Sequence, residues 1–163
     1  MPRLKLALDL EHTLIGNAVS RFPRPGLRSF LDWAGARFGP DNIVIYTAVS
    51  HEIWQDVATH LVADGFAPGW FADLKHLQPE KPLALAWGSS FDDPVKDLRR
   101  VCPDIDQVII VDDYMEYIRH DQRHRWVRIE PWERPDGDTR DADADRELDR
   151  VRSMIEKLAD RPR

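Results

Sequence analysis

The sequence contains a single cysteine, Cys102, among its 163 residues. An internal disulfide is therefore excluded, and so low a cysteine content is typical of a reducing compartment. No apolar run reaches the length that a membrane-spanning helix needs, and the first residues lack the charged-then-apolar pattern of a signal peptide. We therefore expect a cytoplasmic protein with no membrane partner.

The chain also lacks an excess of positive charge. Lysine and arginine number 23 against 29 aspartates and glutamates, and the formal net charge is −6. The surface as a whole is therefore not a nucleic-acid footprint, although a local cluster of arginines between Arg119 and Arg128 leaves such a partner open. The length and the ordinary apolar content predict one globular domain over residues 1–163.

Apolar runs in the sequence predict the strands of a mainly parallel sheet. Three of them are short and nearly continuous, as expected of strands buried on both faces, and a fourth is weaker. Helical spacing of apolar residues separates them, so the order of elements is that of an α/β fold. The expected strands cover 4–8, 43–46, 108–111 and 126–129, and the expected helices cover 26–38, 51–63 and a short stretch that begins near Pro94 after an Asp93 cap.

The remaining segments are less regular. Residues 64–93 are rich in glycine, proline and aromatic residues, and we expect a small insert there, with 83–87 as a short extra strand. Residues 133–147 are strongly acidic and are expected to form a solvated linker. A C-terminal helix over 146–160 follows, and we expect it to pack on the sheet through one apolar stripe: Leu148, Val151, Met154, Ile155 and Leu158.

Reactive side chains stand at the ends of three expected strands. Parallel strands end at the same edge of a sheet, and ligands of open α/β sheets bind outside that edge. Two carboxylates also lie two residues apart just after the first strand, where holding them together is costly unless a cation or a reaction uses them. The side chains expected to converge are Asp9, Glu11, Thr47, Lys96, Asp112 and Asp113.

These residue types suit phosphoryl transfer. Asp9 is able to attack phosphorus and form an aspartyl-phosphate. Several carboxylates in one place need a cation, and Mg²⁺ is a hard ion that prefers oxygen ligands. Lys96 and the Thr47 hydroxyl would bind the phosphate, and Glu11 would protonate the leaving oxygen and then deprotonate water, a role typically worth about 10²–10⁴-fold.

The motifs resemble those of the haloacid dehalogenase (HAD) phosphohydrolases, and most closely the FCP/SCP-type phosphatases. That group comprises the RNA polymerase II C-terminal-domain phosphatases and the NLI-interacting-factor-like proteins. Any one motif is weak, whereas four in order at strand ends form a specific pattern that extends over about residues 3–160. The four motifs are Asp9-Leu10-Glu11-His12-Thr13, Tyr46-Thr47-Ala48, Lys96-Asp97-Leu98 and the run from Val108 to Asp113. The stretch Arg24-Pro25-Gly26-Leu27 adds to the resemblance to the FCP/SCP group.

The resemblance implies a three-layer, Rossmann-like HAD fold with a small insert instead of a large cap. It implies that Asp9 is the nucleophile and Glu11 the general acid and base. It further implies that Mg²⁺ is held by Asp9, the backbone carbonyl of Glu11 and the pair Asp112-Asp113, without showing which of the pair touches the metal. The substrate implied is a phosphoprotein carrying phosphoserine or phosphothreonine, or another bulky phosphomonoester.

The first motif departs from the family pattern. The family has Asp where this chain has Glu11, and Glu where it has His12. Because Glu is one methylene longer, a second hypothesis is a phosphatase-like scaffold or binding module with a weakened site. A third is a nucleic-acid 3′-phosphatase, for which the cluster from Arg119 to Arg128 is the motive.

Overall fold

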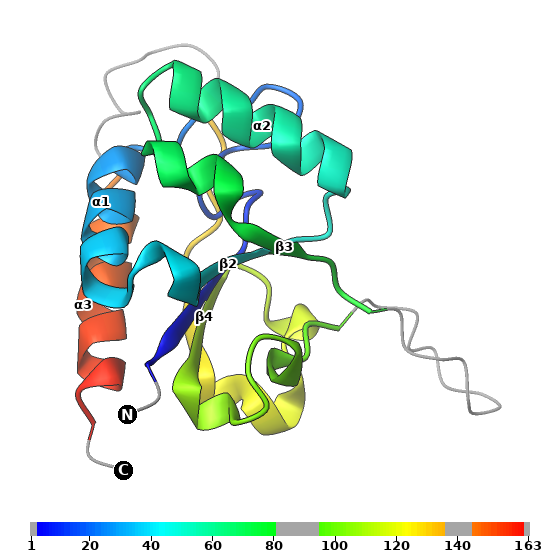
Figure 1. The fold of residues 1–163 in the computed structure, drawn as a ribbon, viewed down its shortest axis with the longest axis vertical. Coiled ribbons are helices and arrows are strands. Elements are labelled where there is room, and N and C mark those ends of the chain that lie inside the picture. The colour runs from blue at the N-terminus through cyan, green and yellow to red at the C-terminus, as the bar shows by residue number, and fades with distance from the viewer. Residues whose placement is uncertain (1–2, 81–94, 136–144, 162–163) are drawn as a thin grey trace, which may run out of the picture.

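The computed structural model describes residues 3–80, 95–135 and 145–161, and these ranges build one parallel five-stranded sheet (Figure 1). Its strand order is β3-β2-β1-β4-β5, and every neighbouring pair is parallel. The strands are β1 (Lys5–Leu8), β2 (Ile43–Tyr46), β3 (Lys75–Leu77), β4 (Val108–Asp112) and β5 (Trp126–Arg128).

The sheet lies between two layers of different character. The α-helices α1 (Leu27–Phe38), α2 (His51–Ala63) and α3 (Glu147–Ala159) pack on one face, and α1 and α3 lie side by side. The other face is covered by 3-10 helices and loops between residues 98 and 118. From β1 the chain adds β2 and then β3 toward one edge of the sheet, and it later adds β4 and then β5 toward the other edge. Because crossovers between parallel strands have the same hand, the connections in these two halves lie on opposite faces of the sheet. The expected three-layer α/β fold is therefore confirmed.

The central strands are buried on both faces, which explains their continuous apolar sequences. Leu8, Ile45 and Val111 pack toward the α-helices, whereas Ala7 and Ile110 pack toward the 3-10 layer. The helix over 51–63 begins where its Ser50 cap predicted, because the Ser50 hydroxyl accepts a hydrogen bond from the Ile53 amide at 3.4 Å.

One strand of the sheet was missed by the sequence prediction. Residues 64–80 were expected within an insert, but they form a 3-10 helix (Gly69–Asp73) and the edge strand β3. Phe71 and Leu74 are buried in the core, so this stretch is part of the fold. The sequence of this strand contains no apolar run, because the strand is three residues long and Lys75 is exposed at the sheet edge. The strand expected over 83–87 lies outside the described residues.

The start of the short helix near Lys96 also differs from the expectation. Asp93 and Pro94 lie outside the described residues, and the described 3-10 helix begins at Leu98, capped by Asp97, whose carboxylate accepts the Arg99 amide at 3.0 Å. Lys96 therefore precedes the helix and forms an isolated parallel bridge with Ile118.

The C-terminal helix packs on the sheet through Leu148, Val151 and Ile155, as expected. Met154 was wrongly placed in the apolar stripe, because its side chain is exposed and its sulfur accepts a hydrogen bond from Arg150 Nη1 at 2.7 Å. The end of the expected linker is not solvated either, since the Asp145 carboxylate is only 14% exposed and pairs with Arg24. Within the described ranges, no helix is long and apolar enough to cross a membrane.

Candidate active site

The expected site residues gather at the carboxyl edge of the sheet. Leu8 of β1 pairs with Ile45 of β2 and with Val111 of β4. Asp9 therefore follows its strand level with Asp112, and its amide donates to the Val111 carbonyl at 3.0 Å. Asp9, Thr47, Lys96 and Asp112 are all buried. The register of the parallel sheet thus brings together groups that lie far apart in the sequence.

The Lys96 side chain is fully buried between two of the carboxylates. Its Nζ lies 2.9 Å from Asp9 Oδ1 and also donates to Asp112 Oδ2. The ammonium lies 5.5 Å from the centroid of the Tyr117 ring and 6.0 Å from that of Tyr46. The Lys96 amide donates to the Tyr117 carbonyl at 2.7 Å, so both ends of the residue are fixed.

The second oxygen of Asp9 is held by Thr13. The Thr13 hydroxyl donates to Asp9 Oδ2 at 2.9 Å, and both residues are buried. The Asp9 carboxylate is thereby fixed by one contact on each oxygen. Thr13 belongs to the first motif of the sequence, but its contact with Asp9 was not predicted. The position of Thr13, four residues after Asp9, is the sequence feature that indicates this contact.

Three carboxylates form a cluster suited to a cation. Asp9, Asp112 and Asp113 each offer an oxygen, and these oxygens lie within 4.8 Å of one another. Burial and the charge of Asp9 raise the pKa of Asp112 to about 7 and that of Asp113 to about 6. Burial alone lowers the pKa of Lys96, but the charges of Asp9 and Asp112 outweigh it and raise that pKa. One ammonium therefore leaves excess negative charge in this cluster.

An all-oxygen donor set of this kind fits Mg²⁺. Both oxygens of Asp112 already accept hydrogen bonds, one from Lys96 and one from the Tyr114 amide at 2.9 Å. The Asp113 carboxyl group is half-buried beside Asp9. Asp9, Asp112 and Asp113 are the residues that would hold the metal, and the part expected of the Glu11 carbonyl stays a prediction.

Glu11 and Thr47 lie at the same edge but outside the carboxylate cluster. Glu11 Oε2 accepts a hydrogen bond from the Ala18 amide at 2.8 Å, so the longer side chain has its own anchor in the loop that follows. The Thr47 hydroxyl accepts the Val49 amide at 3.3 Å, which leaves its own proton available for a phosphate oxygen.

The His12 side chain pairs with a carboxylate outside the cluster, that of Glu133. Its Nδ1 lies 3.1 Å from Glu133 Oε1, and 42% of the side chain is exposed. The residue adopts a left-handed backbone conformation with φ of 60°, which is uncommon for residues other than glycine. The departure from the family pattern at this position therefore changes a solvent-facing side chain on a tight turn.

The arginines between residues 119 and 128 do not form a free basic patch. Arg119 pairs with Asp121 at 3.0 Å and Arg128 pairs with Glu130 at 3.2 Å. Arg125 is buried, and its Nε donates to the Val108 carbonyl at 2.7 Å. The arginines that motivated a nucleic-acid substrate thus have partners within the chain, and that alternative stays a prediction.

A parallel α/β sheet with Asp, Thr, Lys and paired Asp at its carboxyl edge is the arrangement expected of a HAD-type phosphatase fold. The model of one family, the NLI interacting factor-like phosphatases, matches residues 4–162, and the chain belongs to that family.

The fold is also similar to that of a solved structure. It is described as the structure of Fcp1, an essential RNA polymerase II CTD phosphatase, with a TM-score of 0.56 and 20% sequence identity. The match covers 96% of this chain and 50% of the Fcp1 chain, so this chain spans about half the length of that relative. None of the curated proteins compared with this sequence matches it.

Stability should depend on pH and Mg²⁺ together. The raised pKa values of Asp112 and Asp113 mean that the metal-free folded state binds more protons than the unfolded chain between about pH 4 and pH 7. Their contribution to stability therefore falls as pH rises through this range. Mg²⁺ binds the ionised carboxylates, so we expect the rise in Tm that Mg²⁺ causes to be larger at about pH 7.5 than at about pH 5.

Thermal melts with and without Mg²⁺ at the two pH values measure this effect. At a hundredfold excess over Kd, Mg²⁺ should stabilise the folded state by about 2.7 kcal/mol. Asp113→Asn is the matched control, since it removes one ligand and should lose most of the shift. A Mg²⁺ effect that is absent, or equal at both pH values, would contradict the metal site.

Proposed function

We propose that the protein is a Mg²⁺-dependent phosphohydrolase that acts through an aspartyl-phosphate on Asp9. The observation that carries the proposal is the buried ammonium of Lys96 between Asp9 and Asp112. A buried ion pair contributes little to stability, because desolvation of the charges offsets their attraction. A fixed cation beside a fixed carboxylate is, however, what an incoming phosphate dianion needs.

In the first step, an Asp9 oxygen forms a bond to phosphorus and the bond from phosphorus to the leaving oxygen breaks. Glu11 gives its proton to that oxygen. In the second step, Glu11 takes a proton from water, the water oxygen bonds to phosphorus, and the bond to Asp9 breaks. Lys96 and the Thr47 hydroxyl bind the phosphate oxygens. When bound, Mg²⁺ supplies positive charge that offsets the charge of the transferring group.

Turnover of an aryl phosphate with Mg²⁺ tests the reaction. Asp9→Asn keeps the shape of the side chain but removes the nucleophile, so we expect its kcat to fall to background while the wild type turns over only with Mg²⁺. The amide has one oxygen where Asp9 accepts from both Thr13 and Lys96, so the folding of the variant is checked by circular dichroism. Equal turnover in both proteins, or no Mg²⁺-dependent turnover in the wild type, would overturn the proposal.

Two substitutions at Glu11 separate an enzyme from a phosphatase-like scaffold. Glu11→Gln keeps an oxygen for the Ala18 amide but has no proton to transfer, so we expect kcat to fall by about 10²–10⁴-fold. Glu11→Asp keeps the carboxylate but shortens its reach, so we expect a smaller loss. If Glu11→Gln has no effect on an already negligible rate, the scaffold hypothesis is favoured.

The surface beside the loop after β1, residues 9–18, supports a substrate larger than a single phosphorylated residue. A groove of about 930 Å³ lies between residues 19–29, the end of α2 and residues 132 and 134. Val19 lines the groove and follows Ala18, whose amide donates to the Glu11 carboxylate. Its apolar lining includes the exposed rings of Phe22 and Phe66, and the Arg134 guanidinium lies 4.1 Å from the Phe22 ring centroid.

We therefore propose a phosphoprotein as the substrate, in which the groove contacts residues that flank the phosphorylated side chain. The activity of the similar protein Fcp1, an RNA polymerase II CTD phosphatase, is compatible with this substrate class. A cytoplasmic location stays a prediction from the single cysteine.

Substrate size should decide the effect of a change in the groove. We expect Phe22→Ala to raise KM for a phosphopeptide on the order of tenfold, about 1.4 kcal/mol, because a peptide loses an aromatic contact. The KM for an aryl phosphate should change much less. Met154→Ala on α3 is the matched control, an exposed apolar residue outside the groove. Equal effects of Phe22→Ala on both substrates would contradict a peptide-binding groove.

A further inference from the structure

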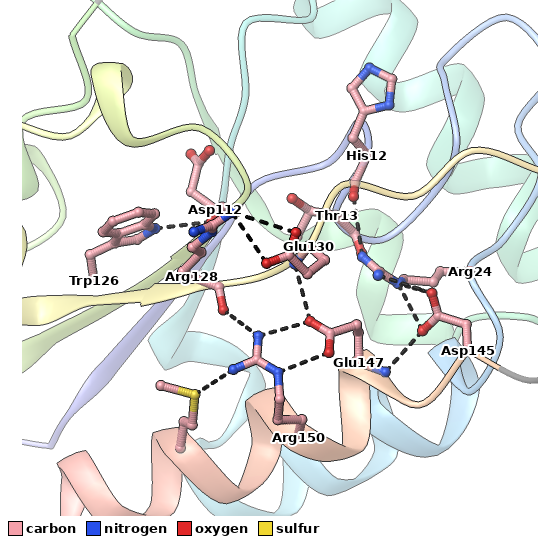
Figure 2. Close-up of polar contacts among 11 residues, drawn as sticks. His12, Thr13, Arg24, Asp112, Trp126, Arg128, Glu130, Asp145, Glu147 and Arg150 are labelled. Carbon is pink, nitrogen blue, oxygen red and sulfur yellow. Dashed lines mark hydrogen bonds and ion pairs between the residues drawn. The ribbon is translucent and has the colours of Figure 1, made fainter.

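Arg24 is a buried cation that lies outside the carboxylate cluster. Its side chain is 1% exposed, and its guanidinium contacts polar groups on two sides. On one side, Nε lies 3.3 Å and 3.2 Å from the two oxygens of Asp145, and Nη2 lies 3.0 Å from Asp145 Oδ2. On the other side, Nη1 donates to the carbonyls of His12 at 3.2 Å and Thr13 at 3.3 Å (Figure 2).

The two carbonyls belong to the turn that carries the catalytic groups. Thr13 donates its hydroxyl to Asp9, and Glu11 precedes His12. The left-handed conformation of His12 is costly for a side chain with a Cβ, and it persists only where surrounding contacts hold it. The Trp132 amide, which donates to the His12 carbonyl at 2.9 Å, and Arg24 Nη1 supply such contacts.

Asp145 connects Arg24 to the C-terminal helix. Asp145 Oδ1 accepts the Glu147 amide at 2.9 Å in the first turn of α3. The Glu147 carboxylate in turn accepts the Glu130 amide at 3.1 Å and Arg150 Nη2 at 2.8 Å. Arg150 also donates to the Arg128 carbonyl in β5 at 2.8 Å. Figure 2 shows these contacts as one continuous path from the start of α3 to the His12-Thr13 turn.

The chemistry of the guanidinium explains why an arginine occupies this place. Its planar fork presents donors in two directions at once, so one side binds a carboxylate while the other binds two carbonyls. A lysine at the same position has a single ammonium and cannot make both sets of contacts in the same geometry. A buried ion pair gives little net stability, so what this pair supplies is fixed geometry at the turn.

We propose that Arg24 is a positioning residue, fixed by Asp145 at the start of α3, that holds the His12-Thr13 turn and so orients the Thr13 hydroxyl toward Asp9 and fixes the chain next to Glu11. The proposal rests on the proposed phosphohydrolase function for its effect on rate. Its effect on the turn itself does not depend on activity. The N-terminal end of α3 is thereby part of the support of the catalytic site.

Arg24→Lys tests the proposal, because it keeps the charge and removes the fork. We expect kcat for an aryl phosphate to fall between about tenfold and 10²-fold, with KM changed less than kcat, because a displaced turn misplaces groups that act in the chemical step. Rates are compared at temperatures where each variant is fully folded by circular dichroism. Arg37→Lys is the matched control, an exposed arginine at the other end of α1 that pairs with Asp160 at 3.1 Å.

Amide hydrogen exchange gives a readout that needs no activity. In Arg24→Lys, the amides of residues 12–16 should exchange faster while those of β4 stay protected. Asp145→Glu is the second variant if Arg24→Lys fails to fold, and it should show the same pattern in weaker form. If the turn stays protected and kcat is unchanged, the proposal is overturned. If the wild type is inactive but the turn still exchanges faster in Arg24→Lys, the phosphohydrolase function is overturned and the positioning role stands.

Discussion

The burial of the Lys96 ammonium between Asp9 and Asp112 is the constraint on which the site depends. A buried ammonium requires carboxylates at hydrogen-bonding distance. The carboxylates of Asp9 and Asp112 in turn require the ammonium, because they lie close to a third carboxylate, that of Asp113. The parallel sheet meets this requirement through its register, because Leu8 pairs with Val111 and the next residues, Asp9 and Asp112, therefore lie side by side. Lys96 leaves part of the negative charge of this cluster unbalanced. A divalent cation would balance that charge and so allow a phosphate to bind beside Asp9.

The rest of the molecule supports this arrangement from two sides. The 3-10 layer holds Lys96 through Tyr117, and Asp97 caps the 3-10 helix that follows. The α-helical layer holds the opposite side, where Arg24 joins the turn after Asp9 to the start of α3. Both layers therefore position side chains around Asp9, and α3 contributes although it lies last in the sequence.

Much of this was predictable from the sequence. The strands over 43–46 and 108–111 are buried on both faces and so appear as apolar runs, and the motif residues follow them directly. The strand β3 was missed because an edge strand of three residues, with Lys75 exposed, carries no such run. The Arg24–Asp145 pair was missed because the two residues are 121 positions apart and Asp145 lies in an acidic segment that looks solvated. The anchor of Glu11 on Ala18 depends on the path of a loop, which local sequence does not determine.

Trapping the covalent intermediate shows whether Asp9 is the nucleophile. The protein is mixed with an aryl phosphate and Mg²⁺, quenched in acid, and digested for peptide mass spectrometry. The account predicts one phosphoryl group on the peptide that contains Asp9, formed only when Mg²⁺ is present. Turnover that proceeds with no phosphoryl group on Asp9, or a phosphoryl group located on another residue, would contradict it.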